Sequence, residues 1–210
     1  MTLRDALPLE TIMGRYPEAR EVVLADTVAS LRANLLNRIP AVGLFVWDEM
    51  AYRGDTKKPD KMQKIYPYRS ERMFSFVTKE LGRVPISDAY YAEWYNSLSE
   101  DEPFIKIELC HCYPSDIHIA DVVFADLSRP ANDITEVSPR QHRGLGIFDE
   151  FLDRLRGVAH DRGVERISLV AASPAAHMFF SKHGFEVSPT LVGQTAFNTL
   201  GYSHPMTLRA

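Results

Sequence analysis

The sequence predicts an α/β fold. Segments with period-two alternation occur in both halves of the chain, and segments with apolar residues at helical spacing lie between them. A turn that holds Gly144 and Gly146 also joins an expected strand to an expected helix. With 210 residues, the chain has the length of one large domain, or of a domain with an extension.

Charge and composition favour a small molecule or a protein as the substrate. The chain has 24 Lys and Arg against 28 Asp and Glu, and this net charge of -4 predicts repulsion from nucleic acid and from anionic lipid. No window reaches the roughly 18 apolar residues of a membrane span, and the start lacks the layout of a signal peptide. We expect a cytoplasmic protein without a nucleic acid or membrane partner. Whether it forms a homodimer is left open.

The first half begins with an expected helix, Glu18 to Asn37, whose apolar residues recur at helical spacing. A strand is expected next, at residues 41–47. Asp48 to Arg69 has the composition of a loop and contains several lysines. It is interpreted as a solvated loop, with contact to a phosphorylated or acidic ligand as the alternative.

Two further helices are expected before residue 100. The first is Ser70 to Leu81, and the second is Asp88 to Ser97, with Ser87 as its cap. The second helix would carry an aromatic stripe, interpreted as core packing rather than as a substrate wall: Tyr90, Tyr91, Trp94 and Tyr95.

A hairpin is expected after Pro103, where the period changes to two. Its first strand alternates from Ile105 onward, its turn is YPSD, and its return strand covers residues 117–127. Cys110 and Cys112 are too close for an unstrained disulfide, and their spacing differs from the usual zinc pairs, so no metal is expected. His111 shares the apolar face of the first strand, either as a core histidine or as a proton acceptor.

The glycine turn follows a short expected strand, Asp133 to Ser138, and leads into a helix with apolar residues facing inward. Amides at the positive end of that helix could face a pyrophosphate, and glycines would let the phosphates approach. A tight turn without a ligand is the alternative. After the helix we expect a buried strand, ERISLVAAS, a short helix, PAAHMFFSKH, and another strand, FEVSP.

These segments resemble the GNAT superfamily of N-acetyltransferases over roughly the last 80 residues. The phosphate motif of the family is Arg or Gln, two variable residues, Gly, one variable residue, then Gly or Ala. A later signature is similar to Asn-x-x-Ala-x-x-Leu-Tyr-x-x-x-Gly-Phe, and its positions are held here by Ser173, Ala176, Phe179, Phe180, Gly184 and Phe185.

The resemblance implies a mixed, strongly twisted sheet with helices on both faces and a final strand at HPMTLRA. It also implies a single domain, 1–210, in which 103–210 form the acyl-CoA-binding core and 1–102 an atypical, enlarged acceptor-side region. The implied activity is transfer of an acetyl group from acetyl-CoA to an amine of a small molecule or peptide, without a metal. The alternatives are a longer or carrier-bound acyl group, or a non-catalytic CoA-binding sensor.

The resemblance also implies which residues contact the cofactor: Val137, Gln141, His142, Arg143, Gly144, Leu145, Gly146, Ile147, Ser173, Ala176 and Phe180. The phosphate motif can be aligned in two ways. When it is aligned from Gln141, the motif is complete, but the apolar positions of the helix that follows do not match those of the family. From Arg143 the helix fits, yet Phe148 stands where a small residue belongs. We favour the alignment from Arg143.

Catalysis would need a base, because an alkyl amine with a pKa of about 10.4 is neutral in only about one molecule in a few thousand at neutral pH. Glu136, and after it Asp133, are the nearest carboxylates to the strand whose amide would polarise the thioester. Phe180 occupies the position of the tyrosine thought to protonate the CoA thiolate, and a phenyl ring has no proton to give. Tyr202 and Ser181 are replacement candidates, and His177 is expected to be exposed.

Overall fold

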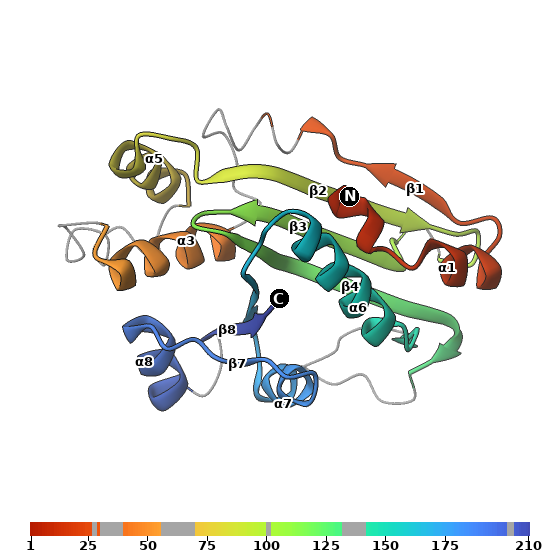
Figure 1. Ribbon diagram of the computed structural model, residues 1–210. Coiled ribbons are helices and arrows are strands. Elements are labelled where there is room, and N and C mark those ends of the chain that lie inside the picture. Colours follow the sequence, from red (N-terminus) through yellow and green to blue (C-terminus); the bar gives the residue numbers. More distant parts are fainter. Residues whose placement is uncertain (27–28, 30–39, 56–69, 100–101, 132–141, 201–203) are drawn as a thin grey trace.

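The computed structural model contains one mixed sheet of eight strands with helices on both faces (Figure 1). The structure describes residues 1–26, 29, 40–55, 70–99, 102–131, 142–200 and 204–210. The sheet has the order β1-β2-β3-β4-β6-β8-β7, and β5 pairs with β4 outside this path. Neighbouring strands are antiparallel except for β4 and β6, which are parallel. The expected α/β fold with a mixed sheet is therefore confirmed.

The strands come from both halves of the chain. They are β1 (Arg20–Val23), β2 (Ile86–Tyr95), β3 (Ile105–Cys112), β4 (Asp116–Pro130), β5 (His142–Gly144), β6 (Arg166–Ala171), β7 (Glu186–Val187) and β8 (His204–Arg209). The helices are η1 (Leu3–Ala6), α1 (Leu9–Arg15), α3 (Pro40–Arg53), α5 (Ser70–Leu81), α6 (Phe148–Asp161), α7 (Pro174–Lys182) and α8 (Leu191–Leu200). The region before residue 103 thus extends the same sheet that the later strands build.

Each face of the sheet has its own apolar core. The larger core joins η1, α1 and α6 to strands β2, β3, β4, β6 and β8, and the buried face of α6 supplies Phe151, Leu152, Leu155 and Val158. On the opposite face α3 and α5 pack on the start of β2 and the end of β3. There Phe45, Val46 and Met50 contact a layer that includes both cysteine thiols. Burial raises the pKa of Cys110 and Cys112, as expected for inert buried thiols.

The expected helix at Asp88 to Ser97 is wrong, because these residues form β2. This segment pairs with β1 on one side and with β3 on the other. Tyr90, Ala92 and Trp94 alternate into the larger core. The aromatic residues satisfy a helical spacing as well as a strand spacing, and their high strand propensity prevails once two neighbouring strands supply backbone partners. Ser87 accordingly caps no helix.

The expected strand at residues 41–47 is also wrong, because it belongs to α3. Periodicity cannot separate a short apolar run in a strand from a buried helix, and α3 is buried around Phe45, Val46 and Trp47. The first residues of the expected helix Glu18 to Asn37 form β1 instead. The expected loop at Asp48 to Arg69 begins inside α3, and residues 56–69 lie outside the described part of the chain.

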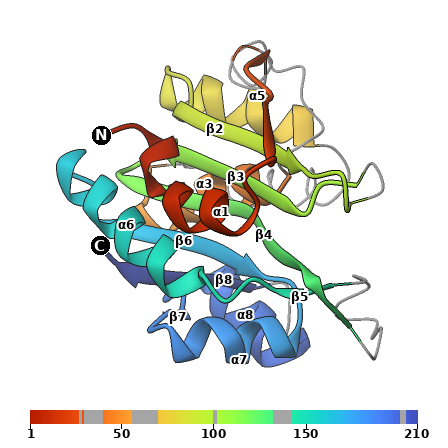
Figure 2. The same ribbon diagram turned by 90° about the vertical axis from the view of Figure 1, so that its right-hand side faces the viewer.

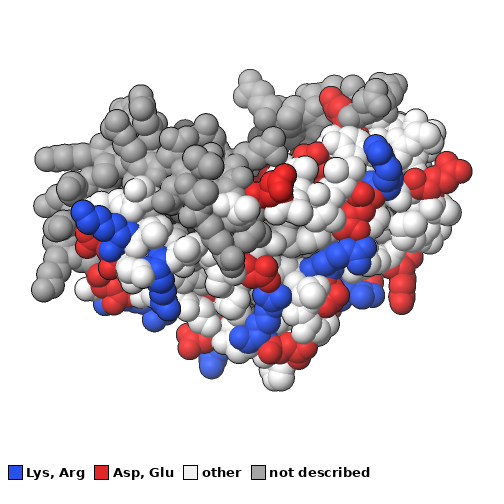
Figure 3. All heavy atoms as spheres, turned by 90° about the horizontal axis from the view of Figure 1, so that it is seen from above, with Lys and Arg blue, Asp and Glu red and all other residues white. Residues whose placement is uncertain are grey.

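The expected strand at Asp133 to Ser138 lies outside the described residues, and the remaining expected elements are confirmed. The confirmed elements are the helix at Ser70–Leu81, the hairpin of β3 and β4, the helix after the glycine turn, β6, α7, β7 and β8, whereas the sequence did not predict α8. None of the described helices is long and apolar enough to cross a lipid bilayer. Acidic and basic side chains are interspersed on the described surface that Figure 3 displays.

Candidate functional site

The two parallel strands of the sheet separate after a short paired stretch. β4 and β6 pair from Asp116 with Arg166 to Ile119 with Leu169. On the other side of β4, Leu109 pairs with Ile119 whereas Glu108 pairs with Asp121, so Ala120 is an extra residue in β4. Such a bulge bends a strand and increases its twist. We attribute the separation of β4 from β6 to the bulge at Ala120.

Beyond the bulge, β4 presents backbone groups on the edge that β6 has left. The amide of Ala125 donates to the carbonyl of Phe104 toward β3, whereas the carbonyl of Phe124 accepts from the amide of Leu145 at 2.5 Å on the other edge. Because backbone groups alternate in direction along a strand, the amide and carbonyl of Val122 point to the same edge as those of Phe124. This edge can therefore donate hydrogen bonds to a bound molecule.

The glycine turn lies against the same stretch of β4. β5 pairs Gly144 with Ala125 and Arg143 with Asp126, beside the far end of β4 in Figure 2. Leu145 and Ile147 are buried and anchor the turn, whereas Gly146 between them is exposed. Gly146 has a φ of 77°, a conformation that glycine adopts without the clash of a Cβ atom.

Helix α6 starts directly after this turn, and its amino end has no side-chain cap. Ile147 is the N-cap residue and offers no oxygen to the first amides, which lack partners inside a helix. The first turn carries two acidic residues, but both have partners: Asp149 pairs with His183 at 2.8 Å and Glu150 with Arg154 at 3.1 Å. The turn and the helix end together can bind an anion through backbone amides.

Phe148 does not fill the turn, although its position would suit a small residue. Its ring packs between α6 and α7, with ring centroids 5.0 Å from Phe179, 5.9 Å from Phe180 and 4.9 Å from His183. The buried residues of α6 are those of the alignment from Arg143.

Helix α7 starts at the end of β6, where Ser173 is its N-cap. The Ser173 hydroxyl accepts a hydrogen bond from the amide of Ala176 at 3.0 Å, so this side chain already has a structural role. Phe180 packs 5.8 Å from Phe185 and has no group that could donate a proton. Ser181 is exposed on α7. Tyr202 lies outside the described residues.

Some of the predicted site residues belong to the described part of the chain and others do not. Asp133, Glu136, Val137 and Gln141 lie outside the described residues, so their roles stay predictions. Among the described residues of the cofactor set, residues 142–147 precede α6, Ser173 begins α7, and Ala176 and Phe180 lie within α7. His142 is half-buried at the start of β5.

Asp126 is a buried carboxylate next to the turn that sequence reasoning missed. It accepts hydrogen bonds from the Tyr16 hydroxyl at 2.7 Å and the Ser128 hydroxyl at 2.7 Å, and it pairs with Arg15 at 2.6 Å. Burial acts to raise the pKa of Asp126, but the hydrogen bonds and the charge of Arg15 outweigh burial and lower it. Asp126 is thus an ionised anchor that ties α1 to β4.

A pair of histidines at the end of β6 was also missed. His204 starts β8 opposite Ala171 and is fully buried. Its Nε2 lies 3.0 Å from Nδ1 of His177 on α7, and the ring of Phe197 from α8 contacts both imidazoles. The expectation that His177 is simply exposed is wrong, because this contact makes it half-buried. The two residues are far apart in sequence, and no spacing rule would have joined them.

His111 is half-buried on β3, where it pairs with Asp88 and Ile117. Burial, and then the nearby charge of Arg162, lower its pKa. This position belongs to the end of the sheet where β4 and β6 are still paired, so His111 is neither a fully buried core residue nor close to the open edge of β4.

The paired end of β4 and β6 is fixed by a buried ionic network. Arg166 binds Asp116 at 2.9 Å and Glu49 of α3 at 2.6 Å. Asp48, next to Glu49, accepts a hydrogen bond from Thr190, which precedes α8. Burial raises the pKa of Asp48 and of Asp116 to about 6. The network holds α3 and α8 against the sheet. It thereby fixes the end at which β4 and β6 are paired, and the two strands separate beyond that end.

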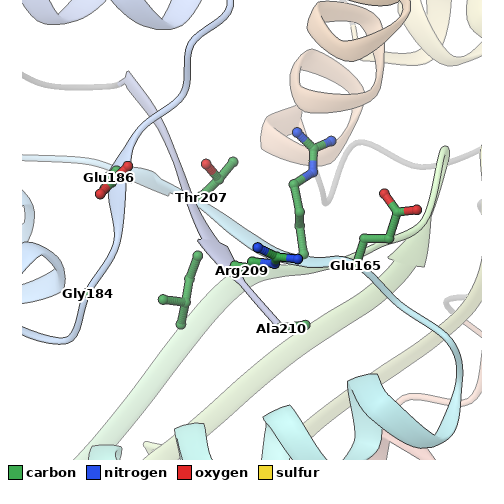
Figure 4. A pocket seen from close by; sticks show the side chains of 8 residues that line it. Glu165, Gly184, Glu186, Thr207, Arg209 and Ala210 are labelled. Carbon is green, nitrogen blue, oxygen red and sulfur yellow. The ribbon is translucent and has the colours of Figure 1, made fainter.

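A shallow hollow of about 710 Å³ lies over β6, β7 and β8 near the same end. Figure 4 shows Glu186 beside Thr207, its partner across the strands, with Arg209 and Glu165 nearby. Its lining mixes both signs of charge. Among the described residues, no group of three or more His, Cys, Asp or Glu side chains could hold a metal ion.

No protein-family model matches the sequence, and no curated protein sequence matches it. Solved structures with some similarity are acetyltransferases. One from Staphylococcus aureus Mu50, described as an acetyltransferase of the GNAT family, is 11% identical with a TM-score of 0.39, over 91% of this chain and 98% of that chain. A variant of the spermidine N-acetyltransferase of Vibrio cholerae is 14% identical with a TM-score of 0.38, over 92% of this chain and 94% of that chain.

A third structure, from Bacillus anthracis, contains acetyl coenzyme A and is assigned as a streptothricin acetyltransferase. It is 14% identical with a TM-score of 0.38, over 60% of this chain, and the present chain spans 64% of its length.

Proposed function

We propose that this protein transfers an acyl group, most simply acetyl, from CoA to an amine of a small molecule or peptide. The observation that carries the proposal is the separation of β4 from β6 at Ala120, with the glycine turn and the uncapped start of α6 beside the open edge of β4. An extended chain can add to an open strand edge through backbone hydrogen bonds. A pyrophosphate suits amides at the start of a helix.

The open edge supplies the electrostatic part of the proposed catalysis. CoA would bring the activated thioester, and the amide of Val122 or Phe124 would donate to the thioester oxygen as negative charge develops there. The amine nitrogen forms a bond to the acyl carbon, the carbon–sulfur bond breaks, and the amine proton passes to a base. We retain Glu136 as that base, with Asp133 as the alternative.

Cofactor contacts are proposed for the described residues His142, Arg143, Gly144, Leu145, Gly146, Ile147, Ser173, Ala176 and Phe180, and for Val137 and Gln141 outside the described part. Arg143 is exposed beside the turn, where its charge suits a phosphate. The Ser173 hydroxyl already accepts the hydrogen bond that caps α7. We expect the same hydroxyl to contact the cofactor through a second hydrogen bond.

A second candidate is a CoA-binding sensor without turnover, favoured by the packing of Phe180 in an aromatic cluster. If transfer does occur, the thiolate must leave unprotonated or take its proton from water or another group, for which Tyr202 is retained as a candidate. An acyltransferase for longer or carrier-bound chains would need an apolar tunnel in addition to this site.

Two measurements test the proposal. Acetyl-CoA at 100 times its Kd should stabilise the protein by about 2.7 kcal/mol, which a thermal shift detects. An unchanged Tm at millimolar acetyl-CoA would contradict cofactor binding. Free-thiol release across a panel of amines then separates the two candidates: transfer releases CoA thiol only with the right amine, whereas a sensor binds acetyl-CoA and releases none.

A further inference from the structure

Four rings form a cluster between the start of α6 and the second half of α7. The ring of Phe148 contacts Phe179, Phe180 and His183, and Phe179 also lies 4.6 Å from His183 and 5.4 Å from Phe180. The members differ in burial. Phe180 packs on the large core, whereas 43% of Phe179 is exposed.

The exposed ring is not required to close the core. Phe180 and Phe148 already fill the space between α6, α7 and the sheet, and Phe179 stands outside them. An aromatic ring that remains exposed forfeits much of the free energy that its burial would contribute. A partner that covers Phe179 would recover this free energy.

The position of the cluster identifies the kind of partner. Phe148 is the first residue of α6 and follows the exposed Gly146 by two positions, so its ring connects Phe179 to the phosphate-binding turn. In a nucleotide, a sugar separates the phosphates from a flat base. A base would therefore lie just beyond the turn, where it could stack on a flat exposed ring. Lys182, exposed one helical turn after Phe179, offers a cation to a phosphate on that sugar.

We propose that Phe179, supported from behind by Phe148 and His183, is the stacking surface for the adenine base of the CoA nucleotide. This inference rests on the proposed function and adds to it the binding site of the nucleotide. Oδ1 of Asp149 lies 2.8 Å from Nδ1 of His183, and this contact fixes the supporting ring. The surface recognises a flat aromatic base through its face and makes no hydrogen bond that would select one base over another.

The test compares the full-length protein with Phe179→Leu, Phe179→Trp and the control Met178→Ala by calorimetric titration. Leu keeps an apolar side chain but removes the flat ring, and Trp keeps a ring. Met178 is the preceding residue, is 60% exposed and has no ring. We expect Phe179→Leu to weaken binding of CoA and of adenosine 3′,5′-bisphosphate by about fivefold to a hundredfold. Phe179→Trp and Met178→Ala should bind as the wild type does.

A ligand without the base separates stacking from a merely structural role. Binding of 4′-phosphopantetheine should be equal in the wild type and in Phe179→Leu, because this molecule lacks adenine. If Phe179→Leu binds CoA as tightly as the wild type, or loses affinity for phosphopantetheine to the same degree, the inference is overturned while CoA binding stands. If the wild type binds no CoA, the proposed function fails first.

Discussion

The buried carboxyl of Asp48 should lower the stability of this protein as the pH rises. Asp48 is 2% exposed, and burial raises its pKa from 3.8 to about 6 despite the hydrogen bond from Thr190. A carboxyl with a raised pKa binds protons more tightly in the folded state than in the unfolded state. Its contribution to stability is therefore present at low pH and is lost as the pH rises through about 6.

The magnitude follows from the two pKa values. With about 3.8 unfolded and about 6 folded, raising the pH from about 5 to about 7 should remove on the order of 1 kcal/mol through Asp48 alone. Asp116, fully buried with a pKa of about 6, should remove a similar amount. The neutral side chain of Asp48→Asn cannot titrate, so about half of this pH dependence should disappear.

Urea unfolding at three pH values in this range measures the effect. The control is Asp153→Asn, an exposed carboxyl paired with Arg156 on the surface of α6, which should keep the wild-type pH dependence. Equal pH dependence in the wild type and in Asp48→Asn would refute the reasoning, because the carboxyl would then titrate alike in both states. An increase in wild-type stability from about pH 5 to about pH 7 would show that buried neutral histidines prevail, because burial lowers the pKa of His118 to about 3 and this group favours the folded state more as the pH rises.

Three further predictions concern the site and its support. Gly146→Ala should cost about 1 to 2 kcal/mol in urea unfolding because of the positive φ, and should reduce the thermal shift by acetyl-CoA, whereas Gly144→Ala should be mild in urea unfolding. Phe151→Ala should lower stability by about 3 to 5 kcal/mol, since the ring is fully buried under α6; a loss below about 1 kcal/mol would contradict its place in the core. Tyr16→Phe should cost about 1 kcal/mol by removing the hydrogen bond to Asp126, and an unchanged midpoint in urea would contradict the anchor role.

Much of the second half could be predicted because local signals agree there. Alternation from Ile105, a turn at YPSD and the apolar face of the helix after Gly146 each point to one element. The tertiary contacts agree with these local patterns, because β3 pairs with β4 and α6 buries its apolar face. Phe148 could not be interpreted from its position alone, because its ring finds space only when α7 lies beside α6.

The first half was harder because its patterns fit two structures. Tyr90 and Trp94 satisfy both helical and strand spacing, and Phe45 to Trp47 form an apolar run without a period. In both cases the neighbours decide: β1 and β3 supply backbone partners for β2, whereas the sheet buries α3 as a helix. Local propensity differs too little between the alternatives to outweigh such partners.

The sequence by itself determined an α/β fold, the glycine turn with its following helix, and the resemblance to acyl-CoA-dependent transferases, since all three are encoded by residues close together in the chain. The tertiary structure alone decided where β4 leaves β6, how His177 meets His204, and which face of α7 leaves Phe179 exposed. These features depend on backbone pairing and packing between segments distant in sequence. A bulge such as Ala120 is defined by the register of two strands, which no single segment contains.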